Sequence, residues 1–182
     1  MTRVSGLLVA SLVAVCPVAT LSEPVVGQKF GDWTFECVAR SQNSADCSLT
    51  QVVTANETQN PVAQFRISAP KADRPGFMSV LIPLGTNLRD GLEASFDNGV
   101  PMPFVPYTCT KNGCLLIAPV SEAVAESLRA QNALDLAFSI TNTNRRYAVK
   151  SSLKGLTKAF EETKWFDGAT FNVAPTPESG TD

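Results

Sequence analysis

Apolar and polar side chains alternate along much of the middle of the chain. The segment DWTFECVA, for example, places Trp33, Phe35 and Cys37 on one side of an extended backbone, with polar residues between them. A period of two with one apolar face is typical of a half-buried β-strand. The same alternation, or a short apolar run, recurs in seven further segments: residues 48–54, 63–68, 78–84, 92–99, 114–120, 134–142 and 146–153.

About eight short strands of this kind predict an all-β fold. We expect an antiparallel β-sandwich, with a barrel as the related alternative, because short strands separated by turn signals are typical of both. The dipeptide Asn98-Gly99 predicts a turn between two of them. Pro83 predicts an edge position or a bulge for its own strand, because proline cannot donate a hydrogen bond to a neighbouring strand.

Two segments depart from the alternation and predict short helices. Residues 121–131 begin with Ser121, a favourable capping residue, and place Val124 and Leu128 four positions apart on one helical face. Residues 153–166 show similar spacing, weakened by a glycine and two threonines. We expect both helices to lie at the periphery and to cover an end or a face of the sandwich.

The first residues follow the order of a secretory signal peptide. Arg3 is the only charged side chain before Glu23, an apolar stretch runs from Val4 to Val15, and small residues follow Pro17. A charged, then apolar, then small-residue order is typical of a cleaved export signal. The apolar stretch is shorter than the roughly 20 residues of a membrane-spanning helix, so we expect no transmembrane segment after its removal.

The chain is therefore divided into four parts. We predict a signal peptide at 1–22, a short leader at 23–29, a single β-sandwich domain at 30–173 and a flexible C-terminal tail at 174–182. The tail is rich in proline, serine, glycine and threonine and has no apolar pattern to bury. Lipid modification of Cys16 is an alternative at the other end, although Val15 replaces the small residue that such sites prefer.

Removal of the signal peptide would leave four of the five cysteines: Cys37, Cys47, Cys109 and Cys114. An even number of cysteines in an exported chain predicts disulfide bonds, because these bonds persist in oxidising compartments. Three connectivities are compatible with four cysteines. Among them we expect local pairing, Cys37 with Cys47 and Cys109 with Cys114.

The segment CTKNGC, residues 109–114, is interpreted as a disulfide across a β-hairpin. A four-residue loop from Thr110 to Gly113 would make the two cysteines face each other, with Gly113 in a left-handed conformation. A thioredoxin-like redox pair or a zinc site would usually show Cys-x2-Cys spacing, which the chain lacks. A redox or envelope-stress accessory that cycles Cys109–Cys114 remains an alternative function.

The composition offers few catalytic groups. The chain has no histidine, which excludes Ser-His and Cys-His pairs and removes the commonest general base. Asp90, Glu93 and Asp97 are close in sequence, so a histidine-free carboxylate hydrolase is a further alternative, provided that two of them meet in a cleft. We expect no enzymatic activity, no cofactor and no metal. The net charge of −2 gives no indication of a nucleic-acid partner.

Two segments are candidates for a partner surface. The proline-rich segment NGVPMPFVPYTC carries Met102, Phe104 and Tyr107, and apolar side chains on a stiff loop make contact surface at low entropic cost. Arg145 and Arg146 lie at a predicted turn and could contact an anionic envelope component. The alternative is that the aromatic side chains fill the sandwich edge and that the arginines are simply solvated.

Five motifs occur in an order that resembles one family of exported bacterial proteins. They are FGDWTFEC, CSLTQ, IPLGTNLRDGLEASFDNG, PFVPYTCTKNGC and SSLKGLTKAF, spanning about Phe30 to Phe160. Together they are similar to the invasion-associated locus B family, although Leu156 stands where the family usually has phenylalanine. The resemblance implies four oxidised cysteines and a periplasmic, outer-envelope or secreted protein of a Gram-negative bacterium. It also implies a link to host-cell invasion in pathogenic relatives, and it supplies no catalytic or cofactor residues.

These observations favour an exported, non-enzymatic interaction module of the cell envelope. The partner would be an envelope or host protein or a glycan, and the expected contact residues are Met102, Phe104, Tyr107, Arg145 and Arg146.

Overall fold

The computed structural model describes residues 24–42, 44–55, 60–71, 74–89, 92–143 and 145–167. The predicted signal peptide at 1–22 and the predicted tail at 174–182 lie outside these residues.

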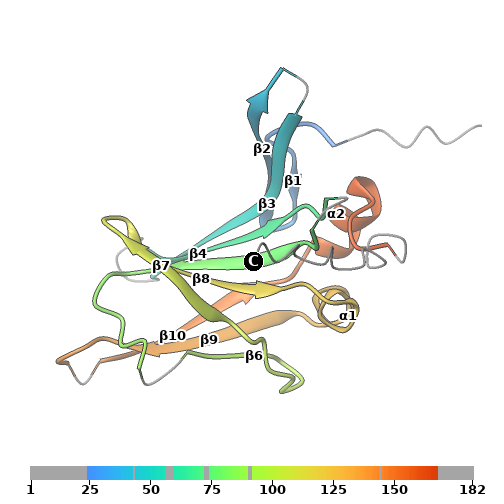
Figure 1. The fold of residues 1–182 in the computed structure, drawn as a ribbon. Coiled ribbons are helices and arrows are strands. Elements are labelled where there is room, and N and C mark those ends of the chain that lie inside the picture. The colour runs from blue at the N-terminus through green and yellow to red at the C-terminus, as the bar shows by residue number, and fades with distance from the viewer. Residues whose placement is uncertain are drawn as a thin grey trace, which may run out of the picture.

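Two antiparallel sheets form an all-β, sandwich-like fold, as the alternation predicts (Figure 1). The larger sheet has seven strands in the order β1 (Lys29–Phe30), β2 (Trp33–Ser41), β3 (Ser44–Thr54), β4 (Pro61–Ser68), β5 (Phe77–Ile82), β8 (Gly113–Pro119) and β7 (Val105–Thr110). The smaller sheet has three, in the order β10 (Arg146–Ser152), β9 (Ala133–Ser139) and β6 (Glu93–Phe96).

Both predicted helices are present, α1 (Glu122–Ala130) and α2 (Leu156–Thr163), and lie together at one end of the sandwich (Figure 1). The Ser121 side chain accepts a hydrogen bond from the backbone N–H of Val124 and so caps α1. Ala125 and Leu128 of α1 are fully buried. In the part of the chain that the structure describes, no helix combines the length and the apolar character needed to cross a membrane.

Alternate residues of each strand face opposite sides of the larger sheet. On β4, Phe65 and Ile67 are fully buried in the core, whereas the alternating residues Gln64, Arg66 and Ser68 are only partly buried. The neighbouring strands follow the same pattern because the register keeps residues of one face opposite each other. The face directed away from the smaller sheet is called the outer face below.

Buried polar groups connect the two sheets. The Ser151 hydroxyl of β10 donates a hydrogen bond to Gln51 Oε1 of β3 at 2.7 Å. The Gln51 amide and the Trp33 indole N–H both donate to the backbone carbonyl of Ser152, at 2.9 Å and 2.8 Å. Because a buried polar group without a partner is costly, this network favours one relative position of the sheets.

Two glycines allow the chain to cross itself where β1 turns into β2. Gly31 and Gly155 have φ values of 59° and 99°, and a side-chain carbon at Gly155 would overlap the backbone of Phe30. The glycine that weakens the prediction of α2 is therefore required just before its first residue, because only glycine accommodates this close approach.

Several local expectations need correction. Pro83 follows the last residue of β5, and β5 lies between β4 and β8, so this proline marks neither an edge strand nor a bulge. Thr110 pairs with Gly113 in the β7–β8 hairpin, so the loop has two residues rather than four, although Cys109 still faces Cys114.

The alternation also does not predict β1 and most of β7. β1 has only two residues, of which Phe30 is buried, so it is too short to show an alternation, and every residue of β7 is exposed. The predicted leader at 23–29 ends with Lys29, the first residue of β1. Two of its residues are hydrogen-bonded to β2: the N–H of Gly27 donates to Phe35 O, and the N–H of Phe35 donates to Gln28 O.

Candidate ligand groove

The register of the strands gathers polar side chains in the centre of the outer face. Arg66 of β4 lies between Thr50 of β3 and Ser79 of β5. One step along, Ser68 lies between Ser48 and Phe77. Because side chains of directly paired residues are neighbours, these two rows form a continuous polar surface across three strands.

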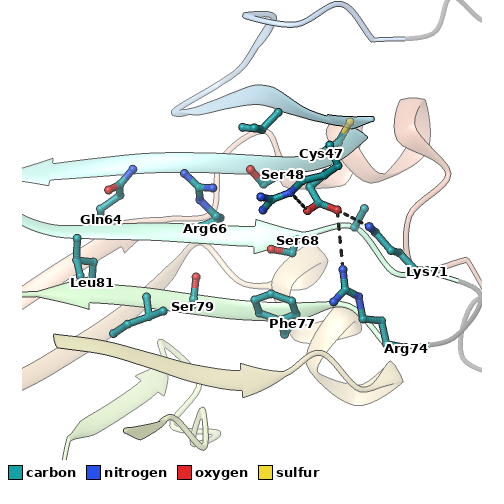
Figure 2. A pocket seen from close by; sticks show the side chains of 15 residues that line it. Cys47, Ser48, Gln64, Arg66, Ser68, Lys71, Arg74, Phe77, Ser79 and Leu81 are labelled. Atoms are coloured by element: carbon teal, nitrogen blue, oxygen red, sulfur yellow. Dashed lines mark hydrogen bonds and ion pairs between the residues drawn. The ribbon is translucent and has the colours of Figure 1, made fainter. Parts of the chain in front are cut away.

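A groove of about 350 Å³ lies over these rows (Figure 2). Ser48 and Ser79 are each only 5% exposed, so these small side chains form its floor. Gln64, Phe77 and Leu81 add one amide and two apolar surfaces. The groove therefore offers hydrogen-bonding groups, flat apolar contacts and charge within one small volume.

Positive charge is concentrated in this groove. Among the described residues that line it, four are cationic (Arg40, Arg66, Lys71 and Arg74) and Asp46 is the single carboxylate. The whole chain carries a net charge of −2, so the groove has the opposite sign to the average of the protein. A concave site with one sign of charge attracts counter-ions of the other sign.

Asp46 holds three of the four cations at one end of the groove. Its carboxylate forms ion pairs with Lys71 and Arg40, and Arg74 Nη2 lies 3.8 Å from Asp46 Oδ1 (Figure 2). The hydrogen bonds from Lys71 and then Arg40 lower the pKa of Asp46 from 3.8 to about 2. Asp46 is therefore ionised at any physiological pH, and its charge is shared among three cations.

Arg66 is less strongly paired. Its ion-pair partner is Glu36, with 4.0 Å between Arg66 Nη2 and Glu36 Oε2, and the two side chains are 42% and 46% exposed. An exposed pair at this distance contributes at most about 1 kcal/mol. The Arg66 guanidinium therefore retains donors that can bind a group from solution.

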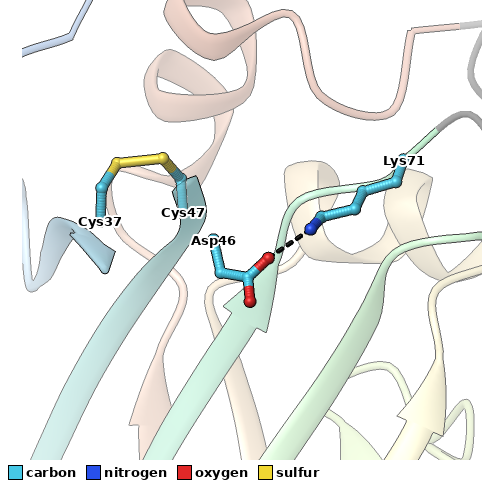
Figure 3. The surroundings of a disulfide bond; sticks show 4 residues. All are labelled: Cys37, Asp46, Cys47 and Lys71. Carbon is cyan, nitrogen blue, oxygen red and sulfur yellow. Dashed lines mark hydrogen bonds and ion pairs between the residues drawn. A yellow bond between two sulfur atoms is a disulfide. The ribbon is translucent and has the colours of Figure 1, made fainter. Parts of the chain in front are cut away.

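The disulfide between Cys37 and Cys47 fixes the strand that carries Asp46 (Figure 3). Cys37 pairs with Cys47, and the next pair along the ladder is Val38 with Asp46. The disulfide lies on the core-facing side and Asp46 on the outer side. A crosslink in the core-facing layer thus restrains the position of a charged group on the outer face.

The second disulfide joins Cys109 to Cys114 across the β7–β8 hairpin. Both bonds agree with the local pairing expected from the sequence. Cys114 is only 5% exposed, which limits the access of another thiol to its sulfur. Within the described ranges, no group of three or more histidine, cysteine, aspartate or glutamate residues could hold a metal ion.

The residues of the predicted partner surface differ in exposure. Met102 and Phe104 are 2% and 9% exposed and belong to the core, so these two residues do not form a contact surface. The backbone N–H of Met102 donates to Ala94 O, which holds Met102 against β6. Tyr107, in contrast, is 69% exposed on β7.

The two arginines of the predicted surface are exposed and lie at the smaller sheet. Arg146 begins β10 and forms an ion pair with Glu93 of β6, and Arg145 precedes that strand. Neither lines the groove on the larger sheet. The structure therefore does not unite the five predicted contact residues into one surface.

The carboxylates of the hydrolase alternative do not meet in this groove either. Glu93 is ion-paired on the smaller sheet, and Asp97 accepts hydrogen bonds from Asn132. Asp90 lies outside the described residues. The acidic group in the groove, Asp46, is surrounded by cations, which favour its ionised form rather than a role as an acid.

Sequence reasoning missed the groove because its charged residues come from separated segments. Arg40 and Asp46 lie on β2 and β3, Arg66 lies on β4, and Lys71 and Arg74 follow β4. The available signal was the polar side of each alternating strand, which places Arg66 between Gln64 and Ser68 on the outer face.

The fold and groove together define a disulfide-crosslinked antiparallel β-sandwich with a cationic groove on one sheet. The sequence model of the family described as "Invasion associated locus B (IalB) protein" matches residues 33–164. The chain therefore belongs to the invasion associated locus B family.

A solved structure shares the fold. The crystal structure of invasion associated protein B from Bartonella henselae superposes with a TM-score of 0.63 at 18% sequence identity. The match covers 75% of this chain and 93% of the Bartonella henselae chain. The comparison with curated protein sequences finds no match.

Proposed function

We propose that this protein is an exported, non-enzymatic module of the cell envelope that acts by binding a partner in the groove of the larger sheet. Export is supported by the two disulfides, since such bonds form and persist in oxidising compartments, and by the signal-peptide pattern before Glu23. Membership of the family agrees with this location.

The observation that carries the binding role is the composition of the groove. Its side chains supply hydrogen-bond donors, apolar contacts and cations, whereas the chain contains no histidine to move a proton at neutral pH. A pocket lined by a few polar groups and fixed charges is suited to recognition. Catalysis through a covalent intermediate would need a nucleophile and a base within hydrogen-bond reach of each other.

The word invasion in the names of the family and of the Bartonella henselae protein describes those proteins. For this chain we infer a location in the envelope and a binding role. The first is supported by its disulfides and its signal-peptide pattern, and the second by the groove. The partner would be an envelope or host protein or a glycan, and not a nucleic acid.

Site-specific crosslinking in living cells tests the binding role. A photoreactive phenylalanine analogue is placed at Leu81 in the groove, and in a control variant at Lys158 on α2. Both variants must be exported and folded, as judged by their disulfides and circular dichroism. We expect a discrete crosslinked species from the Leu81 position and much less of it from the Lys158 position.

Equal crosslinking from both positions, or none from either, would contradict a partner site in the groove. The redox alternative makes a different prediction. Replacement of Cys109 and Cys114 together by serine should abolish a redox function, whereas it should leave groove crosslinking unchanged once folding is verified.

A further inference from the structure

We propose that the groove on the larger sheet binds a sugar that carries a carboxylate or phosphate group, with Arg66 and Arg74 as anion contacts. This inference rests on the proposed binding function and names the ligand class for the same groove. It follows from the charge of the groove, from its position on the sheet and from the hydrogen-bonding groups of its floor.

The charge of the groove favours an anion. Asp46 is a single negative charge shared among Arg40, Lys71 and Arg74, so the cluster keeps an excess of positive charge after pairing. Glu36 offsets only part of the charge of Arg66, because the two groups are 4.0 Å apart. Planar guanidinium groups bind carboxylates and phosphates with two parallel hydrogen bonds, which makes both anions suitable ligands.

Asp46 has a positioning role in this arrangement. It lies on β3, and its ion pairs bring Arg40 of β2 and the two cations that follow β4, Lys71 and Arg74, to one end of the groove. The Cys37–Cys47 disulfide restrains the neighbouring residue of the same strand. Cations that are held in place before binding lose less entropy when a ligand arrives.

The position of the groove argues against an extended peptide. The groove crosses the middle of the sheet, where the backbone groups of β3, β4 and β5 are already paired with each other. A peptide that binds as an added strand needs an unpaired sheet edge. The ligand must therefore be recognised by side chains alone.

The floor of the groove suits a ligand rich in hydroxyl groups. Ser48, Ser68 and Ser79 present hydroxyls that both donate and accept hydrogen bonds, and Gln64 adds an amide. The apolar side chains of Phe77 and Leu81 lie beside them and can pack against the C–H face of a ring. The volume of about 350 Å³ is near the lower end of ligand pockets, so the recognised unit is small.

The test is a nuclear magnetic resonance titration of the full mature chain with both disulfides formed. The probes are glucuronic acid, glucose-6-phosphate, neutral glucose, inorganic phosphate and a tetraglutamate peptide, each added at matched ionic strength. We expect saturable shifts of the amide signals of Arg66, Ser68 and Ser79 with at least one acidic sugar. Glucose and inorganic phosphate should each bind about ten-fold more weakly than that sugar.

The variants Arg66→Gln and Arg145→Gln form a matched pair, because each removes one arginine charge, from the larger or the smaller sheet's side of the chain, and only Arg66 lies in the groove. We expect Arg66→Gln to weaken binding of the acidic sugar about ten-fold, since a charge-assisted hydrogen bond is lost. Arg145→Gln should leave it unchanged. If Arg66→Gln does not fold, Arg74→Gln serves as the second groove variant and should weaken binding in the same direction.

Three results would overturn the inference. These are no saturable shift at the groove with either acidic sugar, binding of inorganic phosphate or tetraglutamate as tight as that of the sugars, and equal losses in Arg66→Gln and Arg145→Gln. Comparison of glucuronic acid with glucose-6-phosphate shows whether the groove prefers a sugar with a carboxylate or one with a phosphate. Failure of the titration together with crosslinking specific to the Leu81 position would reject the ligand class and retain the binding function.

Discussion

The two faces of the larger sheet are built by the same strands and have opposite properties. On the core-facing side, Phe65 and Ile67 of β4 are fully buried against the smaller sheet and the helices. On the outer side, Gln64 and Arg66 of the same strand line a cationic groove. Alternation along one strand therefore separates the residues that stabilise the fold from those available for binding.

This separation has a consequence for mutation. Buried apolar residues contribute to stability through area removed from water and close packing, so their truncation should be costly. Longer side chains on the outer face, such as Gln64 and Arg66, remain partly exposed, so their replacement should change binding and leave the fold largely unchanged. The following predictions test this difference, from the largest expected effect to the smallest.

Adjacent residues of β4 give the strongest contrast. Phe65→Ala should lower the free energy of unfolding by about 3–5 kcal/mol, because Phe65 is completely buried and the change leaves a cavity. Gln64→Ala, one position away on the outer face, should change it by less than about 0.5 kcal/mol. Urea unfolding monitored by circular dichroism measures both free energies. Similar losses of stability in the two variants would contradict the assignment of Phe65 to the core-facing side and Gln64 to the outer face.

The Cys37–Cys47 disulfide couples the two faces. Replacing both cysteines by serine should lower the free energy of unfolding by about 3 kcal/mol, and the same change at Cys109 and Cys114 by about 2 kcal/mol, because the shorter loop constrains the unfolded chain less. Only the first change should also shift the carboxyl resonance of Asp46. A shift of equal size in both variants would show that the disulfide does not restrain Asp46.

Met102 and Tyr107 test which part of the proline-rich segment is buried. Met102→Ala should lower the free energy of unfolding by about 2 kcal/mol, because its side chain is only 2% exposed. Tyr107→Ala, at a residue that is 69% exposed, should have an effect below about 0.5 kcal/mol. The opposite order in thermal or urea unfolding would place Met102 at the surface.

The smallest effect concerns the pH dependence contributed by Asp46. Its pKa of about 2 in the folded chain lies below the usual 3.8, so its stabilising contribution is complete above about pH 4 and disappears as the pH falls towards 2. Asp46→Asn should remove this part of the pH dependence. Unfolding measured between pH 2 and pH 6 in both proteins checks it, and parallel curves would contradict the ion-pair cluster.

Much of the fold could be predicted from local patterns. The alternation of Trp33, Phe35 and Cys37 predicts β2, and the four-residue spacing of Val124 and Leu128 predicts α1, because each pattern reflects one buried face of a regular element. The local disulfides follow from pairs of strands that are adjacent in sequence. β7 lacks such a face, and this explains why the alternation did not predict it.

The candidate site could not be predicted in the same way. Arg145 and Arg146 attract attention because they are adjacent in sequence, whereas the cations around Asp46 become neighbours only when β2, β3 and β4 pair in their observed register. The proline-rich, apolar sequence around Met102 and Phe104 predicts a contact surface for a partner. These two side chains are instead buried, because the segment packs against β6.

The sequence by itself determined most of the strands, the two helices and the cysteines available for crosslinking, because periodicity and spacing are properties of neighbouring residues. Tertiary structure alone decided which polar faces meet and which apolar side chains remain exposed. The physical reason is that sheet order and register bring together residues far apart in the chain, such as Arg66 and Ser79 or Asp46 and Arg74. No local pattern contains that information.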